Sequence, residues 1–151
     1  MKVDSLSELL DGMKDKYMGL FWSKKANCRF DIEDNIYINM NNEQIEQAIN
    51  NYIINAYEHI PEKGTAVVTL KSVGDKAVIS VFNDGNNIKE EELSKIWEGF
   101  YQTDERVKES NVGLGLYIVR NIVKNHNGVC YAKNHHNGVE FVMEFNRTDK
   151  Y

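Results

Sequence analysis

The sequence predicts an α+β fold in one domain, and three observations lead to this prediction. Three stretches place apolar residues at helical spacing, at residues 5–21, 43–60 and 111–128. Segments rich in β-forming residues come in pairs joined by short turns, which is typical of hairpins. The 151 residues hold no internal repeat, low-complexity tract or linker, so a single domain over residues 1–151 is expected.

The first elements along the chain follow from the spacing of apolar residues. Residues 5–21 present one apolar helical face, and residues 27–31 and 35–40 are expected to be short strands. A helix over residues 43–60 follows, because an apolar stripe begins just after two asparagines at 41–42 that can cap it. The proline–glycine segment after residue 60 ends this helix.

Two hairpins and two helices are expected in the rest of the chain. The hairpins join residues 65–73 to 76–83 and residues 129–133 to 139–145. Between them, residues 101–112 are polar without periodicity and are predicted to be a mobile loop. A short helix before this loop is expected to carry four apolar residues on one face, namely Leu93, Ile96, Trp97 and Phe100.

Composition excludes several classes of function. The net charge is −5 with acidic and basic residues interspersed, so nucleic acid is not an expected partner. Cys28 and Cys130 are too far apart in the chain for zinc-ligand spacing, and we interpret both as reduced, buried and inert thiols. No membrane-spanning run or signal peptide occurs, so this segment is predicted to be cytoplasmic and not to contact a membrane.

Two polar patterns point to a ligand site, although each has an ordinary structural explanation. Asn51, Asn55 and His59 recur at helical spacing, and an amide oxygen together with phosphate oxygens would suit Mg²⁺; the alternative is a solvated polar face. Gly113 and Gly115 open the last helix, where free N–H groups can bind phosphate. Taken alone, this glycine pair favours close helix packing instead.

A third pattern, FNDGNNI at residues 82–88, follows a predicted strand and has the composition of a turn. Together, INNYIINAYEH, VFNDGNNI, IWEGFY and VGLGLYIVRNIVKNHNG closely resemble the four nucleotide-binding boxes of the sensor histidine kinase catalytic domain. That domain belongs to the ATP-binding superfamily shared with gyrase, Hsp90 and MutL. The resemblance covers about residues 4–145 and implies a Bergerat-type fold, a two-layer α/β sandwich whose mixed, mostly antiparallel sheet is covered on one face by helices.

The resemblance also implies a site for ATP and Mg²⁺. Asn55 matches the asparagine that binds Mg²⁺, and Asn51 matches a residue close to the phosphates; these two are the expected catalytic residues. His59 and Asn83 match positions near the adenine. The remaining residues implied to contact ATP are Gly85, Ile88, Phe100, Gly113, Leu114, Gly115 and Leu116.

Several positions differ from the family pattern. Asn83 replaces an aspartate that accepts a hydrogen bond from the adenine amine; its amide oxygen can still accept, but the bond is weaker. Asn87 stands where a second glycine is usual, and Glu58 where lysine is frequent. We hypothesise that Arg106 and Lys108, in the predicted loop, supply the missing positive charge.

The resemblance implies a catalytic fragment that passes the γ-phosphoryl group of ATP to a histidine on a separate dimerisation domain of the same kinase. A response regulator would be the downstream partner, and the parent protein can be a membrane-anchored sensor kinase. The isolated domain is expected to be monomeric and to lack autophosphorylation, because the family's phosphoacceptor motif is absent from it.

Two other functions remain open at this point. An anti-sigma-factor-like serine kinase can be a free-standing domain of this size, but that group usually carries glutamate where Asn51 stands. A degenerate nucleotide-binding or protein-interaction module without kinase activity is the second alternative, and the substitutions at Glu58, Asn83 and Asn87 support it.

Overall fold

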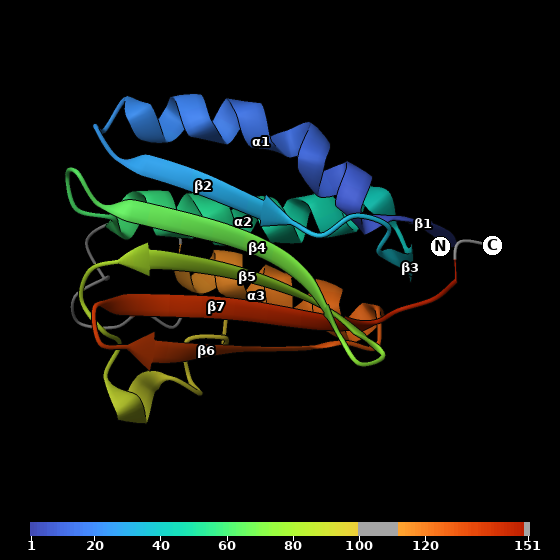
Figure 1. Ribbon diagram of the computed structural model, residues 1–151. Coiled ribbons are helices and arrows are strands. Elements are labelled where there is room, and N and C mark those ends of the chain that lie inside the picture. The colour runs from blue at the N-terminus through green and yellow to red at the C-terminus, as the bar shows by residue number, and fades with distance from the viewer. Residues whose placement is uncertain (100–111, 150–151) are drawn as a thin grey trace.

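Three helices cover one face of a five-stranded sheet (Figure 1). The computed structural model describes residues 1–99 and 112–149, with side chains from residue 115 onward in the second range. Helix α1 packs against β2, α2 lies behind β4 and β5, and α3 lies behind β6 and β7. The elements in chain order are β1 (Lys2–Ser5), α1 (Leu6–Trp22), β2 (Asn27–Ile32), β3 (Tyr37–Met40), α2 (Asn42–His59), β4 (Thr65–Val73), β5 (Lys76–Asp84), the 3₁₀ helix η1 (Glu90–Glu92), α3 (Val112–Asn125), β6 (Val129–His135) and β7 (Gly138–Asn146).

The main sheet has the strand order β2-β4-β5-β7-β6. Strands β2 and β4 are parallel, while every other neighbouring pair in this sheet is antiparallel. The predicted two-layer α+β architecture with a mixed, mostly antiparallel sheet is therefore confirmed. The sequence interpretation missed β1, which pairs with β3 in a separate two-stranded antiparallel sheet.

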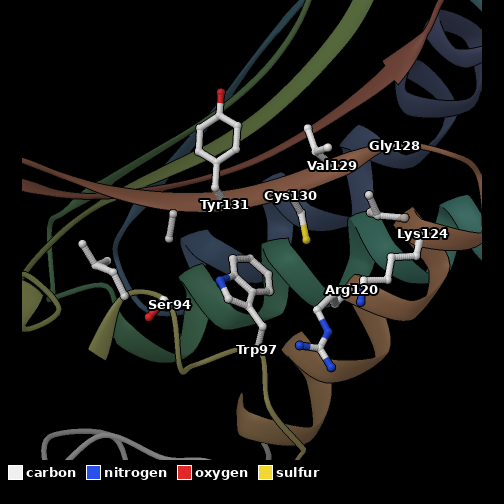
Figure 2. A pocket seen from close by; sticks show the side chains of 11 residues that line it. Ser94, Trp97, Arg120, Lys124, Gly128, Val129, Cys130 and Tyr131 are labelled. Carbon is white, nitrogen blue, oxygen red and sulfur yellow. The ribbon is translucent and has the colours of Figure 1, made fainter. Parts of the chain in front are cut away.

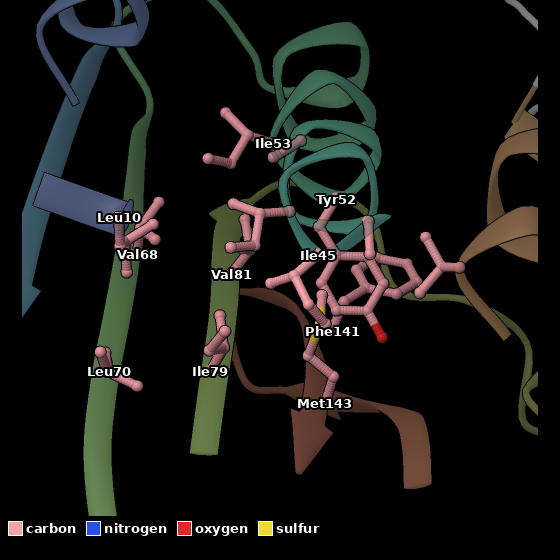
Figure 3. Close-up of a cluster of buried hydrophobic side chains, with 14 of the residues drawn as sticks. Leu10, Ile45, Tyr52, Ile53, Val68, Leu70, Ile79, Val81, Phe141 and Met143 are labelled. Atoms are coloured by element: carbon pink, nitrogen blue, oxygen red, sulfur yellow. The ribbon is translucent and has the colours of Figure 1, made fainter. Parts of the chain in front are cut away.

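The hydrophobic core lies between the helical layer and the inner face of the sheet (Figure 3). Strand residues alternate between faces, so every second side chain of β4, β5 and β7 meets the apolar stripes of the helices. Tyr52 lies within this core, and its hydroxyl donates a hydrogen bond of 2.8 Å to the carbonyl of Val142. Other buried side chains of this core, labelled in Figure 3, are Leu10, Ile45, Ile53, Val68, Leu70, Ile79, Val81, Phe141 and Met143.

Polar residues at the predicted positions cap the first two helices. The hydroxyl of Ser5 accepts from the backbone N–H of Glu8 at 3.0 Å, at the start of α1. Asn41 accepts in the same way from the N–H of Gln44 at 3.0 Å and begins α2. These bonds satisfy N–H groups that have no partner within the helix, which is why both helices begin where the caps predict.

Two predicted elements are wrong in extent. The strand expected at residues 35–40 begins only at Tyr37, because Asn35 has a φ of 62°, a left-handed conformation that breaks a strand. The helix expected before the polar loop is replaced by η1 and a series of turns. Ile96 and Trp97 nevertheless reach the core, so tertiary packing holds this segment together with local backbone bonds such as that from the N–H of Ile96 to the carbonyl of Glu92 at 3.2 Å.

Candidate functional site

A row of polar residues on α2 faces the interior of the domain. Asn55 is only 4% exposed, and Asn51 and His59 are half-buried. Asn51 donates from Nδ2 to the carbonyl of Gly115 at 3.3 Å, which joins α2 to the first turns of α3. His59 donates from Nδ1 to the carbonyl of Asn55 at 2.9 Å. The alternative of an ordinary solvated face therefore does not apply to this row.

Asn83, at the end of β5, is a buried polar side chain with an unused acceptor. It is 2% exposed, and its Nδ2 donates to the carbonyl of Asp84 at 2.8 Å. Its Oδ1 is buried and accepts no hydrogen bond from the described residues. A buried acceptor in this state costs about 1–3 kcal/mol, which a ligand with a matching donor would recover.

The neighbouring carboxylate has a structural role. Asp84 accepts from the backbone N–H of Thr65 through Oδ2 at 2.7 Å, at the start of β4. Its Oδ1 accepts from Nδ2 of Asn137 at 3.4 Å. Because successive strand residues point to opposite faces, Asp84 cannot replace the buried amide beside it.

Gly85 allows the loop after β5 to approach the end of α2. Its φ of 138° lies in a region that L side chains rarely adopt. A Cβ at this position would lie 3.3 Å from the carbonyl oxygen of His59 and 3.6 Å from Nδ2 of Asn83. The predicted close approach therefore brings three expected site residues together.

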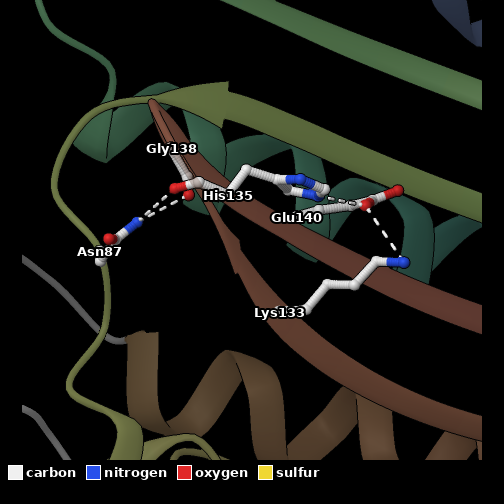
Figure 4. A network of polar contacts seen from close by, with 5 residues as sticks. All are labelled: Asn87, Lys133, His135, Gly138 and Glu140. Carbon is white, nitrogen blue, oxygen red and sulfur yellow. Dashed lines mark hydrogen bonds and ion pairs between the residues drawn. The ribbon is translucent and has the colours of Figure 1, made fainter.

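The β6–β7 hairpin holds this loop in place (Figure 4). Asn87 donates from Nδ2 to the carbonyls of His135 and Gly138, at 3.0 and 2.9 Å. Asn134 forms a two-way pair with the backbone of Ile88, accepting from its N–H at 2.9 Å and donating to its carbonyl at 2.7 Å. Asn87 does not have a positive φ, so its side-chain bonds, rather than tolerance of a left-handed backbone, explain its place here.

The hairpin also supplies residues that the sequence interpretation missed. A Cβ on Gly138 would lie 2.1 Å from the carbonyl oxygen of Asn83, so only glycine fits there. The turn composition of this stretch predicted a hairpin but did not indicate what the hairpin would touch. Its histidine His135 belongs to a surface ion pair, 2.7 Å from Glu140, which also lies 3.7 Å from Nζ of Lys133 (Figure 4).

The start of α3 lies beside the polar row of α2. A Cβ on Gly115 would meet nothing within 4 Å, so close packing does not require glycine there. The side chain of Leu116 is 1% exposed and packs in the core. Only the backbone of Leu116 can therefore contact a ligand. Gly113 and Leu114 belong to the first turn of the helix. N–H groups in such a turn lack helical partners and attract anions.

Some expected site residues cannot be placed. Phe100, Arg106 and Lys108 lie outside the described residues, as does the predicted loop up to residue 111. No cluster of three or more histidine, cysteine, aspartate or glutamate side chains suited to a metal occurs in the described part of the chain. Asn55 itself offers a buried amide oxygen, a ligand type that suits a cation taking its other ligands from phosphate and water.

Comparison with known proteins gives consistent results. The sequence model of histidine kinase-, DNA gyrase B- and HSP90-like ATPases matches residues 40–149. Sporulation kinase A of Bacillus subtilis is 35% identical over 114 residues, which is 75% of this chain and 18% of that protein. Sensor protein IrlS of Burkholderia pseudomallei is 38% identical over 86 residues, 56% of this chain and 18% of that protein. The chain thus spans less than a fifth of the length of either relative.

Solved structures of similar chains cover the whole fold. The catalytic domain of histidine kinase ThkA superposes with a TM-score of 0.84 at 27% identity, over 98% of this chain and 97% of that one. The same kinase in complex with the response regulator protein TrrA matches with a TM-score of 0.83 at 27% identity, over 97% of this chain and 42% of that one. Within residues 1–99 and 112–149, no helix combines the length and hydropathy of a membrane span.

Proposed function

Since this chain belongs to the family of histidine kinase-, DNA gyrase B- and HSP90-like ATPases, we propose that it transfers the γ-phosphoryl group of ATP to a histidine on a separate domain. The chain is an ATP-binding domain of the sensor histidine kinase type, with the Bergerat-type fold. What is proposed is its own catalytic competence, its site residues and its partners. The unused, buried Oδ1 of Asn83 beside Gly85 is the observation that carries the proposal.

In this proposal, Oδ1 of Asn83 accepts a hydrogen bond from the adenine amine. Because its Nδ2 is held by the carbonyl of Asp84, the amide cannot rotate without setting two oxygens against each other. The amide of Asn83 therefore presents only an acceptor to the base, as an aspartate would. Adenine offers a donor at that position and guanine offers an oxygen, so the site favours adenine nucleotides. His59 and Ile88 border the base from α2 and from the loop.

The phosphates lie at the junction of α2 and α3. Gly113 and Leu114 offer free backbone N–H groups in the first turn of α3, and the backbone of Gly115 and Leu116 continues the proposed phosphate contact. Asn51 on α2 donates a hydrogen bond to the carbonyl of Gly115 and so keeps the first turns of α3 in position.

Asn55 is the proposed Mg²⁺ ligand. Mg²⁺ accepts few protein ligands and keeps phosphate oxygens and waters around it, so a single buried amide oxygen fits its chemistry. The ion would supply charge neutralisation on the phosphates. The protein's own part is to hold the triphosphate in line with the acceptor, because phosphoryl transfer depends mainly on positioning and electrostatics.

The acceptor histidine lies on another domain. His59, His126 and His135 each form a hydrogen bond or ion pair that supports the fold. In the transfer, the bond between the γ-phosphorus and its bridging oxygen breaks, a phosphorus–nitrogen bond to the acceptor imidazole forms, and ADP leaves.

The partners follow from the same proposal. They are the dimerisation domain of the same kinase and, downstream, a response regulator, as ThkA has in TrrA. We propose that the domain works in the cytoplasm, is monomeric when isolated, and does not phosphorylate itself alone.

Calorimetry with a non-hydrolysable ATP analogue, with and without Mg²⁺, tests the proposal. We expect Mg²⁺ to increase the affinity for the analogue. In Asn55→Ala, the affinity measured with Mg²⁺ should fall roughly tenfold or more. The matched control is Asn121→Ala, an exposed asparagine on α3, which leaves binding unchanged. Absence of binding at millimolar analogue would instead support a degenerate module.

A second assay separates the two kinase classes. The domain is mixed with the cognate dimerisation domain and labelled ATP, and the product is treated with acid. Acid-labile phosphate is expected, because phosphohistidine hydrolyses in acid. Acid-stable phosphate would assign the chain to serine kinases.

A further inference from the structure

A groove of about 520 Å³ lies between residues 93–97, α3 and β6 (Figure 2). Its walls are the indole of Trp97, the side chains of Val123 and Ala132, and the thiol of Cys130. In Figure 2 the sulfur of Cys130 points toward Trp97 across the groove. Its volume falls in the range of small-molecule sites, which are also mostly apolar.

The groove is separate from the nucleotide site. Among the described residues, none that is expected to contact ATP lines it. An α-helix turns about 100° per residue, so Arg120 and Lys124 lie about 140° and 180° around α3 from Gly115. The two sites therefore use opposite sides of one helix.

Two positively charged side chains, those of Arg120 and Lys124, line this apolar groove, and none of the lining residues is acidic. Within residues 1–99 and 115–149, neither cation has an ion pair, and the buried Nε of Arg120 makes no hydrogen bond. The guanidinium carbon lies 5.6 Å from the ring centre of Tyr117, a contact that leaves its donors available. This local positive charge occurs on a chain whose net charge is −5.

The thiol of Cys130 contributes to the apolar wall. Burial raises its pKa to about 11, although Arg120 and Lys124 pull it in the opposite direction. The thiol is therefore neutral at physiological pH and does not neutralise either cation.

We propose that this groove binds a small organic anion with an apolar body. The body packs against Trp97 and Cys130, and a carboxylate, sulfonate or phosphate ester accepts from Arg120 and Lys124. Apolar surface without the cations would favour a neutral ligand, and exposed cations without the groove would attract any anion weakly. Their combination selects amphiphilic anions. The inference does not depend on the proposed kinase activity.

Fluorescence titration of the full chain with 8-anilinonaphthalene-1-sulfonate tests it. In a Trp22→Phe background, Trp97 is the single tryptophan, and its emission is expected to be quenched to saturation with one site. Arg120→Gln with Lys124→Gln should weaken binding about tenfold or more. The matched control removes an exposed Arg and Lys elsewhere, Arg29→Gln with Lys71→Gln, and should change affinity less than about twofold.

Three results in this titration would overturn the proposal. One is equal affinity in the groove variant and the wild type. Another is equal affinity for the uncharged N-phenyl-1-naphthylamine, which lacks the sulfonate. The third is displacement by Mg²⁺ and ATP, which would place the probe in the nucleotide site. Should the partly buried Arg120 prove necessary for folding, the exposed Lys124→Gln alone should weaken binding about threefold.

Thiol protection gives an independent readout. N-ethylmaleimide at pH 9, followed by peptide mapping, reports Cys130 and Cys28 separately. The sulfonate probe should slow alkylation of Cys130 and leave Cys28, which is 7% exposed in the core, unaffected. Unchanged alkylation of Cys130 would contradict the proposal. So would a probe affinity that falls as protein concentration rises, because a second copy of the chain would then fill the groove.

Discussion

Asn83 and His126 are both buried polar side chains, yet they are buried in opposite ways. His126, at the end of α3, is 7% exposed and uses both ring nitrogens: Nε2 accepts from the N–H of Asn41 at 3.1 Å, and Nδ1 donates to the carbonyl of Ile122 at 2.8 Å. Asn83 is 2% exposed and leaves its Oδ1 unused within the described residues.

The difference separates a structural residue from a ligand-binding one. Because a backbone N–H can only donate, His126 carries its proton on Nδ1 and clamps the end of α3 to the start of α2. Both ring nitrogens of His126 form hydrogen bonds that stabilise the fold. Asn83 is held by one bond and keeps an acceptor that no described residue satisfies and that a ligand can satisfy. For this pair, complete pairing goes with the structural role and incomplete pairing with the proposed site.

The largest effect is expected where the fold holds Asn83 in place. Gly138→Ala would put a Cβ 2.1 Å from the carbonyl oxygen of Asn83, so the backbone must shift. We expect a loss of roughly 3 kcal/mol in the free energy of unfolding and weaker binding of the ATP analogue. Urea denaturation and calorimetry measure the two. Gly12→Ala is the control, because a Cβ there meets nothing within 4 Å. An unaltered affinity would show that the hairpin does not position Asn83.

The next effect concerns His126. His126→Ala leaves the N–H of Asn41 without its partner and removes the side-chain bond to the carbonyl of Ile122, which keeps its bond from the backbone N–H of residue 126; it should cost about 2 kcal/mol of stability. Affinity for the ATP analogue should stay within about twofold, since the clamp lies at the other end of the helices. The comparison breaks down if affinity falls as much as stability does.

Asn83→Leu should give the reverse pattern. Removing the unused buried acceptor offsets the loss of the Nδ2 bond to the carbonyl of Asp84, so stability should change by less than about 1 kcal/mol, while the lost hydrogen bond to adenine weakens binding about tenfold. Asn83→Asp, which restores an acceptor, should bind at least as well as the wild type. A leucine variant that binds normally would remove Asn83 from the site.

The last effect appears only at alkaline pH. Burial raises the pKa of Cys28 to about 12 and that of Cys130 to about 11, from an ordinary value of 9.0. The folded state keeps these protons where the unfolded state loses them. The stabilisation is therefore fully present below pH 9 and is lost progressively as the pH rises toward 12. Chemical denaturation across this range should give a shallower decline for Cys28→Ser with Cys130→Ser.

Much of the fold could be predicted because its signals are local. Helical spacing placed all three helices to within about three residues, and the caps at Ser5 and Asn41 mark the starts of α1 and α2. The segment around Trp97 was mispredicted for the same reason: its apolar spacing is helical, but burial against α3 and the sheet holds it in turns. The strand β1 was missed because its partner β3 lies more than thirty residues away.

For the candidate site, too, local motifs could be predicted from the sequence and contacts between distant residues could not. Residue types and their order in four motifs identified Asn51, Asn55, Asn83, Gly85 and the glycines of α3, which is sufficient to predict a nucleotide site. They did not reveal that Asn87 and Asn134 hold the loop, because their partners lie 46 to 51 residues away along the chain.

The sequence by itself determined most of the elements and the family, and it predicted which residues face a nucleotide, because periodicity and motif spacing are properties of neighbouring residues. Only the tertiary structure decided what each polar group does. It pairs both ring nitrogens of His126 and, among the described residues, leaves one acceptor of Asn83 without a donor and places no atom within 4 Å of a Cβ built on Gly115. The physical reason is that a hydrogen bond is defined by the position of its partner, and the chain brings distant partners together only when it folds.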